Sequence, residues 1–297
     1  MRSLSLENDF LEREYNPRAT IPNALALFSQ WKARAGDARE ACKPRIDLAY
    51  GDSPAEKLDY FAADGADGAD GADGAAGAGS PLLVFIHGGY WRALDKADFS
   101  WIAPPYVAAG ISVAVLNYGL APKTTIAEIV EQIRRAIAWL YANADDLGVD
   151  NTRIFCSGHS AGGHLTGMML ATDWSTVAPG LPSTPLAGAL TISGVFDVEP
   201  LTRAEFLRHD IGLDAEGARA LSPAFLQLQS PVPLLRAVGA LESAEFHRQQ
   251  EMIKQQWPSV CKAAMLDVPG CNHLTVCEAF STPGNMLFEA MRAAIRN

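Results

Sequence analysis

One serine in the chain stands in a setting that suits nucleophilic chemistry. The pentapeptide GHSAG places Ser160 between Gly158 and Gly162. An apolar run at 153–157 precedes it, and helix-forming residues at 164–171 follow it. A strand, a G-x-S-x-G turn and a helix make up a nucleophile elbow, in which the glycines prevent clashes around a strained serine. We therefore predict a nucleophile at Ser160, the alternative being an ordinary glycine-rich turn.

A serine hydroxyl needs a base within hydrogen-bond reach to react at neutral pH. Where a nucleophile elbow lies on an open sheet, the chain order is nucleophile, acid, histidine. The histidines far enough beyond Ser160 are His209, His247 and His273. His247 falls in an expected helix, and His209 lies among short helices. We predict His273 as the base, because it follows the last expected strand and can reach over the edge of the sheet.

The acid partner of this histidine is expected after the strand at 232–238. Glu242 lies in the loop that follows this strand. Its carboxylate would accept the second ring proton of His273 and fix the tautomer. An acid at this position can instead cap the next helix. Other carboxylates remain candidates, namely Asp197, Glu245 and Asp267.

Backbone amides are the expected donors to the negative charge that develops on a substrate. One is the amide of Ala161, directly after the predicted nucleophile. The others are expected from the loop HGGYW at 87–91, which follows an apolar strand. Gly88 and Gly89 let this backbone approach a substrate closely, and Tyr90 follows them. We predict an oxyanion hole from these four residues.

The composition bounds the class of protein. The chain has 297 residues, of which 48% are hydrophobic, and a net charge of -10. The acidic balance argues against non-specific nucleic-acid binding. The first residues lack the apolar core of a secretory signal, and no run of about 18 apolar residues suits a membrane span. The five cysteines include no C-x-x-C pair. We expect a cytoplasmic protein with no nucleic-acid or membrane partner and no cofactor or metal.

Apolar strand runs alternate with helical patterns along the chain, which predicts an α/β fold with a mostly parallel sheet and helices on both faces. A capping box of Thr125 and Glu128 begins a long helix. The expected strands are 45–50, 57–61, 81–89, 111–117, 153–157, 186–193, 232–238 and 263–268. The expected helices are 4–15, 24–41, 97–109 (interrupted by Pro104-Pro105), 124–147, 164–171, 244–256 and 286–295.

We expect one domain over residues 1–297. Its N-terminal helical segment, 1–44, either covers the site or wraps the core. Residues 63–80 repeat Ala-Asp-Gly and contain no large apolar side chain, which predicts a flexible insertion without a metal site. Residues 199–230 contain several prolines and predict a small cap of short helices.

Five segments of the chain carry a family likeness. HGGYW at 87–91, GHSAGGHL at 158–165, SGVFDVEPL at 193–201, ALESAEFHRQ at 240–249 and GCNHLTV at 270–276 closely resemble kynurenine formamidase (arylformamidase). That family is a hormone-sensitive-lipase-like esterase/lipase branch of the α/β-hydrolases. The likeness covers roughly residues 10–297, apart from the Ala-Asp-Gly insertion.

The resemblance implies an α/β-hydrolase fold and a triad of Ser160, Glu242 and His273, with Glu242 where the family usually has aspartate. It also implies hydrolysis of N-formyl-L-kynurenine to L-kynurenine and formate, a step of tryptophan catabolism.

A formyl group calls for a tight acyl pocket, and an aromatic leaving group calls for a flat apolar cleft. Residues near the motifs that are expected to contact the substrate are Tyr90, Trp91, His159 and Tyr15. The sequence does not decide between an aryl formamide and a short-chain ester, so a carboxylesterase is the alternative. A binding protein on a retired hydrolase fold is a third hypothesis. The oligomeric state is open, with a homodimer among the options.

Overall fold

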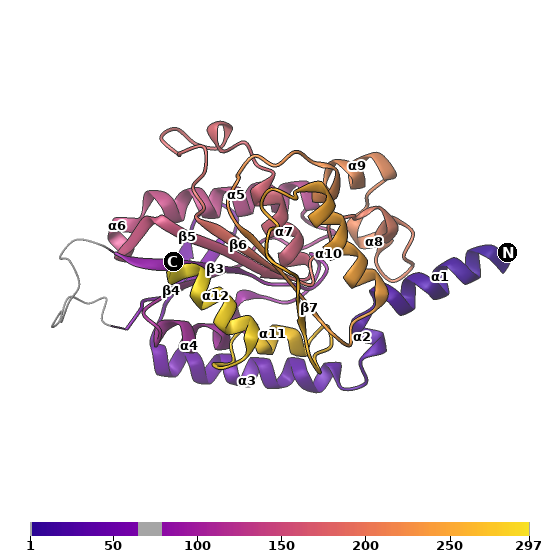
Figure 1. Cartoon of the computed structure of the whole chain (residues 1–297), viewed down its shortest axis with the longest axis horizontal. Coiled ribbons are helices and arrows are strands. Elements are labelled where there is room, and N and C mark those ends of the chain that lie inside the picture. The colour runs from indigo at the N-terminus through magenta and orange to yellow at the C-terminus, as the bar shows by residue number, and fades with distance from the viewer. Residues whose placement is uncertain (1, 65–78, 297) are drawn as a thin grey trace.

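The computed structural model of the chain describes residues 2–64 and 79–296. Its centre is an eight-stranded sheet with the order β1-β2-β4-β3-β5-β6-β7-β8 (Figure 1). The pairs β1–β2 and β2–β4 are antiparallel, and all other neighbours pair in parallel. The predicted mostly parallel sheet is confirmed. The strands are β1 Arg45–Ala49, β2 Lys57–Phe61, β3 Ser80–Ile86, β4 Ser112–Leu116, β5 Val149–His159, β6 Gly188–Ile192, β7 Leu234–Gly239 and β8 Leu266–Val268.

Helices cover both faces of the sheet (Figure 1). One face carries α5 (Ile126–Ala142), α6 (Ala144–Leu147), α7 (Ala161–Leu170) and α10 (Ala244–Gln256). The other carries α3 (Ala24–Cys42), α4 (Ala103–Val107), α11 (Thr275–Ala279) and α12 (Met286–Arg296). The remaining helices are α1 Arg2–Tyr15, α2 Pro17–Thr20, α8 Arg208–Ile211 and α9 Ala215–Ala220, with short 3-10 turns η1 Lys96–Asp98, η2 Ser100–Ile102, η3 Trp174–Thr176, η4 Glu199–Thr202 and η5 Pro223–Phe225.

The continuous apolar run of β3 follows from this three-layer arrangement. Successive side chains of a strand point to opposite faces. Leu82, Val84 and Ile86 therefore join the core under α5 and α7, whereas Leu83 and Phe85 join the core under α3 and α12. Because both faces are covered, the buried positions 82–86 of the strand are all apolar.

Several element boundaries differ from the sequence prediction. The segment 97–109, expected as a helix interrupted at Pro104-Pro105, forms η1, η2 and α4. The two prolines lie in the first turn of α4, where proline is tolerated. The helix expected at 124–147 breaks at Asn143 into α5 and α6. Its predicted capping box is confirmed, because Thr125 and Glu128 each accept the other's backbone amide. The short helix α11 was not predicted.

The Ala-Asp-Gly insertion is only partly described. Residues 65–78 of the predicted flexible insertion lie outside the described residues. At its ends, the amide of Ala63 donates to Ser112 Oγ, and Ser80 already belongs to β3. The cap expected at 199–230 consists of η4, α8, α9 and η5. No described helix is long and apolar enough to cross a membrane.

Candidate active site

Ser160 occupies the turn between β5 and α7. Its φ of 57° and ψ of -116° lie where residues with side chains are strained. A Cβ at Gly158 would lie 2.2 Å from the carbonyl oxygen of Gly162, and a Cβ at Gly162 would lie 2.0 Å from that of Ile86. Only glycine fits at these two positions, so the expected elbow geometry is present.

His273 and Glu242 form a buried pair beside this elbow. His273 Nδ1 lies 2.6 Å from Glu242 Oε2, and the side chain of Glu242 is fully buried. The other carboxylate oxygen, Oε1, accepts the amide of Gly239 at 2.7 Å and the hydroxyl of Ser193 at 2.5 Å. These donors hold the carboxylate in place. Since His273 donates from Nδ1, its ring presents an unprotonated Nε2 when neutral.

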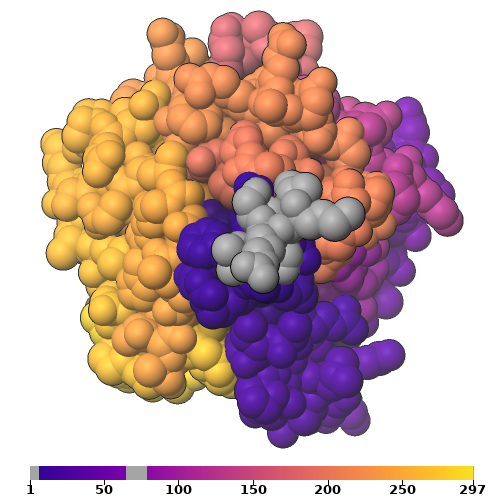
Figure 2. Space-filling view, turned by 90° about the vertical axis from the view of Figure 1, so that its right-hand side faces the viewer, coloured from indigo at the N-terminus to yellow at the C-terminus, as the bar shows by residue number. Residues whose placement is uncertain are grey.

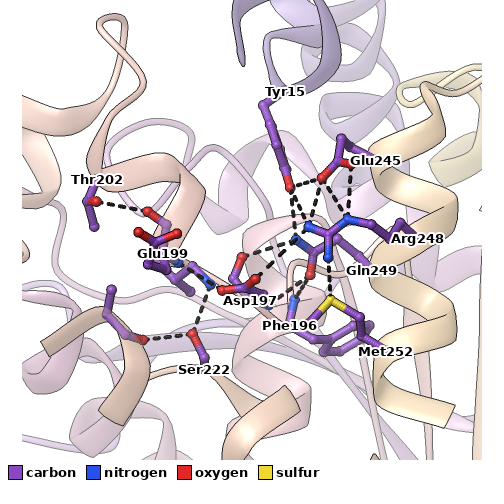
Figure 3. Close-up of polar contacts among 12 residues, drawn as sticks. Tyr15, Phe196, Asp197, Glu199, Thr202, Ser222, Glu245, Arg248, Gln249 and Met252 are labelled. Carbon is purple, nitrogen blue, oxygen red and sulfur yellow. Dashed lines mark hydrogen bonds and ion pairs between the residues drawn. The ribbon is translucent and has the colours of Figure 1, made fainter. Parts of the chain in front are cut away.

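The rival carboxylates lie elsewhere. Asp197 Oδ1 accepts the amide of Glu199, and the Asp197 backbone is held by Gln249 of α10 (Figure 3). Burial raises the pKa of the Asp197 carboxyl. Glu245 binds the Tyr15 hydroxyl at 2.5 Å. Asp267 is exposed, so among the candidates only Glu242 contacts His273.

A pocket of about 390 Å³ opens over the elbow, and both Ser160 and His273 line it. No hydrogen bond joins Ser160 Oγ to the His273 ring among the described residues. Such contacts are often long in unliganded enzymes and shorten when substrate binds. The ring of Phe246 packs against His273 with centroids 4.2 Å apart, which limits the movement of the imidazole. His209 is largely exposed, and its Nε2 lies 3.9 Å from Glu205 Oε1. It does not line the pocket, so it is not placed to act as the base.

The loop HGGYW lies against the elbow. A Cβ at Gly88 would come within 3.2 Å of Ser160 Cβ, and Gly89 and Tyr90 line the pocket. Gly89 has a φ of 108° and Tyr90 a φ of 52°, so the chain turns sharply here. Among the described residues, the amides of Gly89, Tyr90 and Ala161 donate to no acceptor. They are therefore available as donors to an oxyanion.

Trp91 is not in the pocket, which corrects its expected role as a substrate contact. Its side chain is fully buried, and Nε1 donates to His164 Nδ1 at 3.2 Å. His164 Nε2 in turn donates to the carbonyl of Leu221 at 2.7 Å. Burial lowers the pKa of His164 to about 4, so the ring is neutral and can accept from Trp91. The pair ties the HGGYW loop to the helix that follows Ser160.

Tyr15 also does not have its expected role as a substrate contact. Its ring is fully buried, and its hydroxyl binds Glu245, Arg248 and Gln249 of α10 (Figure 3). Tyr90, by contrast, lines the pocket and donates its hydroxyl to the Tyr15 carbonyl. Tyr15 therefore anchors the N-terminal segment to α10 and to the HGGYW loop.

His159 lines the pocket, as expected for a substrate contact, and it also supports the candidate base. Its Nε2 donates to the backbone carbonyl of His273 at 2.7 Å. Burial holds the pKa of His159 well below its usual value, so the ring stays neutral. His159 thus fixes the backbone that carries the imidazole of His273.

The sequence did not indicate most of the pocket wall. The N-terminal segment supplies much of it, through α2 and the exposed side of α3, and the cap supplies Phe206. Figure 2 shows this segment (indigo) lying between the cap region (orange) and the C-terminal region (gold). The larger aromatic and aliphatic side chains of the wall include Leu25, Phe28, Trp31, Tyr90, Leu94, Phe206 and Leu274. The N-terminal segment therefore covers the site rather than only wrapping the core.

No group of three or more His, Cys, Asp or Glu side chains within residues 2–64 and 79–296 is placed to hold a metal ion.

Comparison with known proteins shows which proteins the chain resembles. A family model described as BD-FAE matches residues 73–180. Kynurenine formamidases from Danio rerio and Salmo salar are each 28% identical to the chain. Both matches cover 92% of this chain; they cover 92% of the Danio rerio protein and 91% of the Salmo salar protein. Esterase LipC from Mycobacterium tuberculosis is 26% identical over 77% of the chain and 59% of its own length.

Solved structures agree with these matches. A Silicibacter protein, assigned only provisionally as a thioesterase, is 30% identical with a TM-score of 0.80, covering 97% of this chain and 99% of that one. A truncated carbohydrate esterase from gut microbiota shares the fold at 19% identity and a TM-score of 0.65, over 85% of this chain and 95% of that one. The chain is a hydrolase of the α/β-hydrolase superfamily, and over nearly all of its length it is similar to kynurenine formamidases.

Proposed function

We propose that the protein is a serine hydrolase that removes the formyl group from aryl formamides, with N-formyl-L-kynurenine as substrate and L-kynurenine and formate as products. The observation that carries this proposal is the buried His273–Glu242 pair, whose histidine lines the same pocket as the elbow serine. The relatives named kynurenine formamidase support the choice of substrate. The reaction would place the protein in tryptophan catabolism.

In the proposed mechanism, Ser160 Oγ attacks the formyl carbon while His273 Nε2 accepts its proton. Glu242 stabilises the imidazolium that forms. The negative oxygen of the tetrahedral intermediate accepts hydrogen bonds from the amides of Ala161, Gly89 and Tyr90. Each donor of this kind contributes about 3 to 4 kcal/mol to transition-state stabilisation.

The intermediate then expels the arylamine, which takes the proton from His273 and leaves a formyl ester on Ser160. A water molecule, activated by the same imidazole, hydrolyses this ester and releases formate. The aromatic wall formed by Phe28, Trp31 and Phe206 suits the planar leaving group. The closeness of Gly88 to Ser160 leaves little space beside the nucleophile, which favours a small acyl group.

A short-chain carboxylesterase is the second candidate, because esterases are among the relatives and share the fold. The test compares kcat/KM for N-formyl-L-kynurenine with kcat/KM for 4-nitrophenyl acetate and for a short-chain thioester. We expect the formamide to be the preferred substrate. A much higher kcat/KM on the ester or thioester would contradict the formamidase proposal while leaving the serine mechanism intact.

A further inference from the structure

The solvent side of the pocket carries positive charge in a chain whose net charge is -10. Arg18, Lys32 and Arg92 line it, and the lining includes one carboxylate among the described residues, Asp98. Arg92 is paired with Asp210. For Arg18 and Lys32, no described carboxylate lies within ion-pair distance. Unpaired cations thus gather at the pocket, against the charge of the molecule as a whole.

The two unpaired cations are placed by the local structure of the N-terminal segment. Asn16 caps α2 by accepting the amide of Ala19 at 3.2 Å, which orients the turn that carries Arg18. The Arg18 guanidinium lies 5.9 Å from the centre of the Phe28 ring, a cation–π contact. Lys32 follows Phe28 by four residues on α3, so both lie on one helix face. The cations and the aromatic wall therefore share one surface.

This surface is fixed relative to the candidate catalytic groups. The Tyr15 hydroxyl binds Glu245 of α10 (Figure 3), and the Tyr90 hydroxyl donates to the Tyr15 carbonyl. Ser243, next to the candidate acid, donates its hydroxyl to the carbonyl of Glu14 at 2.6 Å. The segment is thus bonded both to the loop that carries the candidate oxyanion donors and to the loop that carries the acid.

We propose that Arg18 and Lys32 form an anion subsite that binds the carboxylate of an amino-acid-like substrate whose formamide group meets Ser160. This inference rests on the proposed function and specifies which part of the substrate each end of the pocket holds. The guanidinium offers a planar pair of donors to a carboxylate, and the ammonium adds a point charge. Asp98 supplies an acceptor for the ammonium group of the same substrate.

The test compares two formamides, of which one carries a zwitterionic amino-acid group and the other has no charged group. N-formyl-L-kynurenine carries the amino-acid group, whereas 2′-formamidoacetophenone is the same aryl ketone without it. In the double variant Arg18→Gln/Lys32→Gln, we expect kcat/KM for the charged substrate to fall about tenfold more than kcat/KM for the neutral one, through KM. High salt screens the two cations, so it should also reduce the preference of the unaltered protein for the charged substrate.

A matched control removes the same charge elsewhere. Arg219 lies 4.2 Å from the centre of the Phe225 ring, and Lys262 is exposed; neither lines the pocket. We expect Arg219→Gln/Lys262→Gln to keep the preference for the charged formamide. If both double variants lost the preference for the charged formamide equally, the effect would come from the overall charge of the protein and not from a subsite. If kcat/KM of Arg18→Gln/Lys32→Gln fell equally for both formamides, the substitutions would have disturbed the pocket wall in general. Either result would overturn the subsite.

Binding of the amine products separates this inference from the proposed function, because it requires no turnover. Calorimetry should show that the unaltered protein binds L-kynurenine more tightly than 2′-aminoacetophenone, and that Arg18→Gln/Lys32→Gln loses this difference. Equal or absent binding of both amines to the unaltered protein would overturn the subsite even if formamides are hydrolysed. Failure to hydrolyse formamides, with selective binding retained, would overturn only the proposed function.

Discussion

At the scale of single residues, the candidate site depends on how completely Glu242 is held. Its buried carboxylate accepts three hydrogen bonds, from Ser193, Gly239 and His273. A buried carboxylate without such partners would be unstable in its charged form. With them, one oxygen is committed to Nδ1 of His273 and the other to Ser193 and Gly239. The imidazole then presents Nε2 to the pocket that contains Ser160.

Replacing either proposed reacting group should nearly abolish turnover. Ser160→Ala removes the attacking oxygen, and His273→Ala removes the base that activates it. We expect each variant to lose kcat by roughly 10⁴-fold or more. Steady-state kinetics gives the loss, and circular dichroism with a thermal melt verifies that each variant is folded. A folded Ser160→Ala variant with more than a tenth of the original kcat would rule out Ser160 as the nucleophile.

The acid assignment is tested by a pair of variants. Glu242→Gln keeps an acceptor for Ser193 and Gly239 but removes the charge that stabilises the imidazolium. We expect kcat to fall by on the order of 10²- to 10⁴-fold, less than for Ser160→Ala. Asp197→Asn should keep most of the rate, because Asp197 does not touch His273. The opposite pattern, with Asp197→Asn impaired and Glu242→Gln active, would move the acid to Asp197.

The sequence indicated the elbow at Ser160 and the neighbouring pair His273 and Glu242 better than the pocket wall, for a physical reason. An elbow needs glycine at 158 and 162, so its signal is local and can be read from the chain. Whether an aromatic residue near a motif touches substrate or packs inside depends on distant partners. Tyr90 lines the pocket, but Trp91 is buried by His164 and Tyr15 by α10. The contributions of Ser193 and Gly239 to holding the acid likewise come from strands that meet only in the fold.

At the scale of elements, the contact between Trp91 and His164 connects the HGGYW loop to α7. The loop supplies the candidate donors Gly89 and Tyr90, and α7 begins directly after Ser160. Their relative position must be accurate to a fraction of an ångström for the donors to meet an oxyanion. We therefore propose that Trp91 is a positioning residue, which acts through its hydrogen bond to His164 rather than by touching substrate.

Trp91→Phe should separate this positioning role from packing alone. The variant keeps an aromatic ring but leaves buried His164 Nδ1 without its donor, which costs about 1–3 kcal/mol of unfolding free energy. We expect kcat to fall severalfold with little change in KM. The matched control is Trp174→Phe, since Trp174 is also buried and donates Nε1 to Ser230 at 3.1 Å, away from the loop. A similar kcat for both variants would refute the positioning role.

Element prediction failed where short-range signals conflicted with the tertiary structure. The helical pattern at 124–147 continued through Asn143, whose side chain instead bonds back to the Trp139 carbonyl at the end of α5. For the other helices, the length of the helix decided whether it could be predicted. The five-residue helix α11 is too short for a periodic pattern to be recognised, whereas α10, with 13 residues, was predicted with its observed bounds.

At the scale of the whole molecule, three histidines are buried as neutral groups around the site. Burial lowers the pKa of His87 and His164 and lowers that of His159 strongly. In the unfolded chain these groups have pKa values near 6.5. At a pH between the folded and the unfolded pKa, the unfolded state binds more protons than the folded state. Lowering the pH through this range therefore favours unfolding. Stability is therefore retained above about pH 6.5 and is lost as the pH falls toward the folded pKa values.

For His164, with a folded pKa of about 4, the expected loss at pH 5 is about 2 kcal/mol of unfolding free energy relative to pH 7.5. Urea unfolding at the two pH values measures it. His164→Gln carries no ionisable group at this position, so its stability should depend less steeply on pH. An unaltered protein as stable at pH 5 as at pH 7.5, or a His164→Gln variant with an equally steep dependence, would contradict this account of the buried histidines.

The central claim is that Ser160 is an activated nucleophile, and covalent labelling tests it most directly. The native protein is treated with a fluorophosphonate, and the adduct is located by peptide mass spectrometry. The account predicts one adduct, on the peptide that contains Ser160, with no labelling of folded Ser160→Ala. An unlabelled native protein that still hydrolyses formamides, or equal labelling of the Ser160→Ala variant, would contradict it.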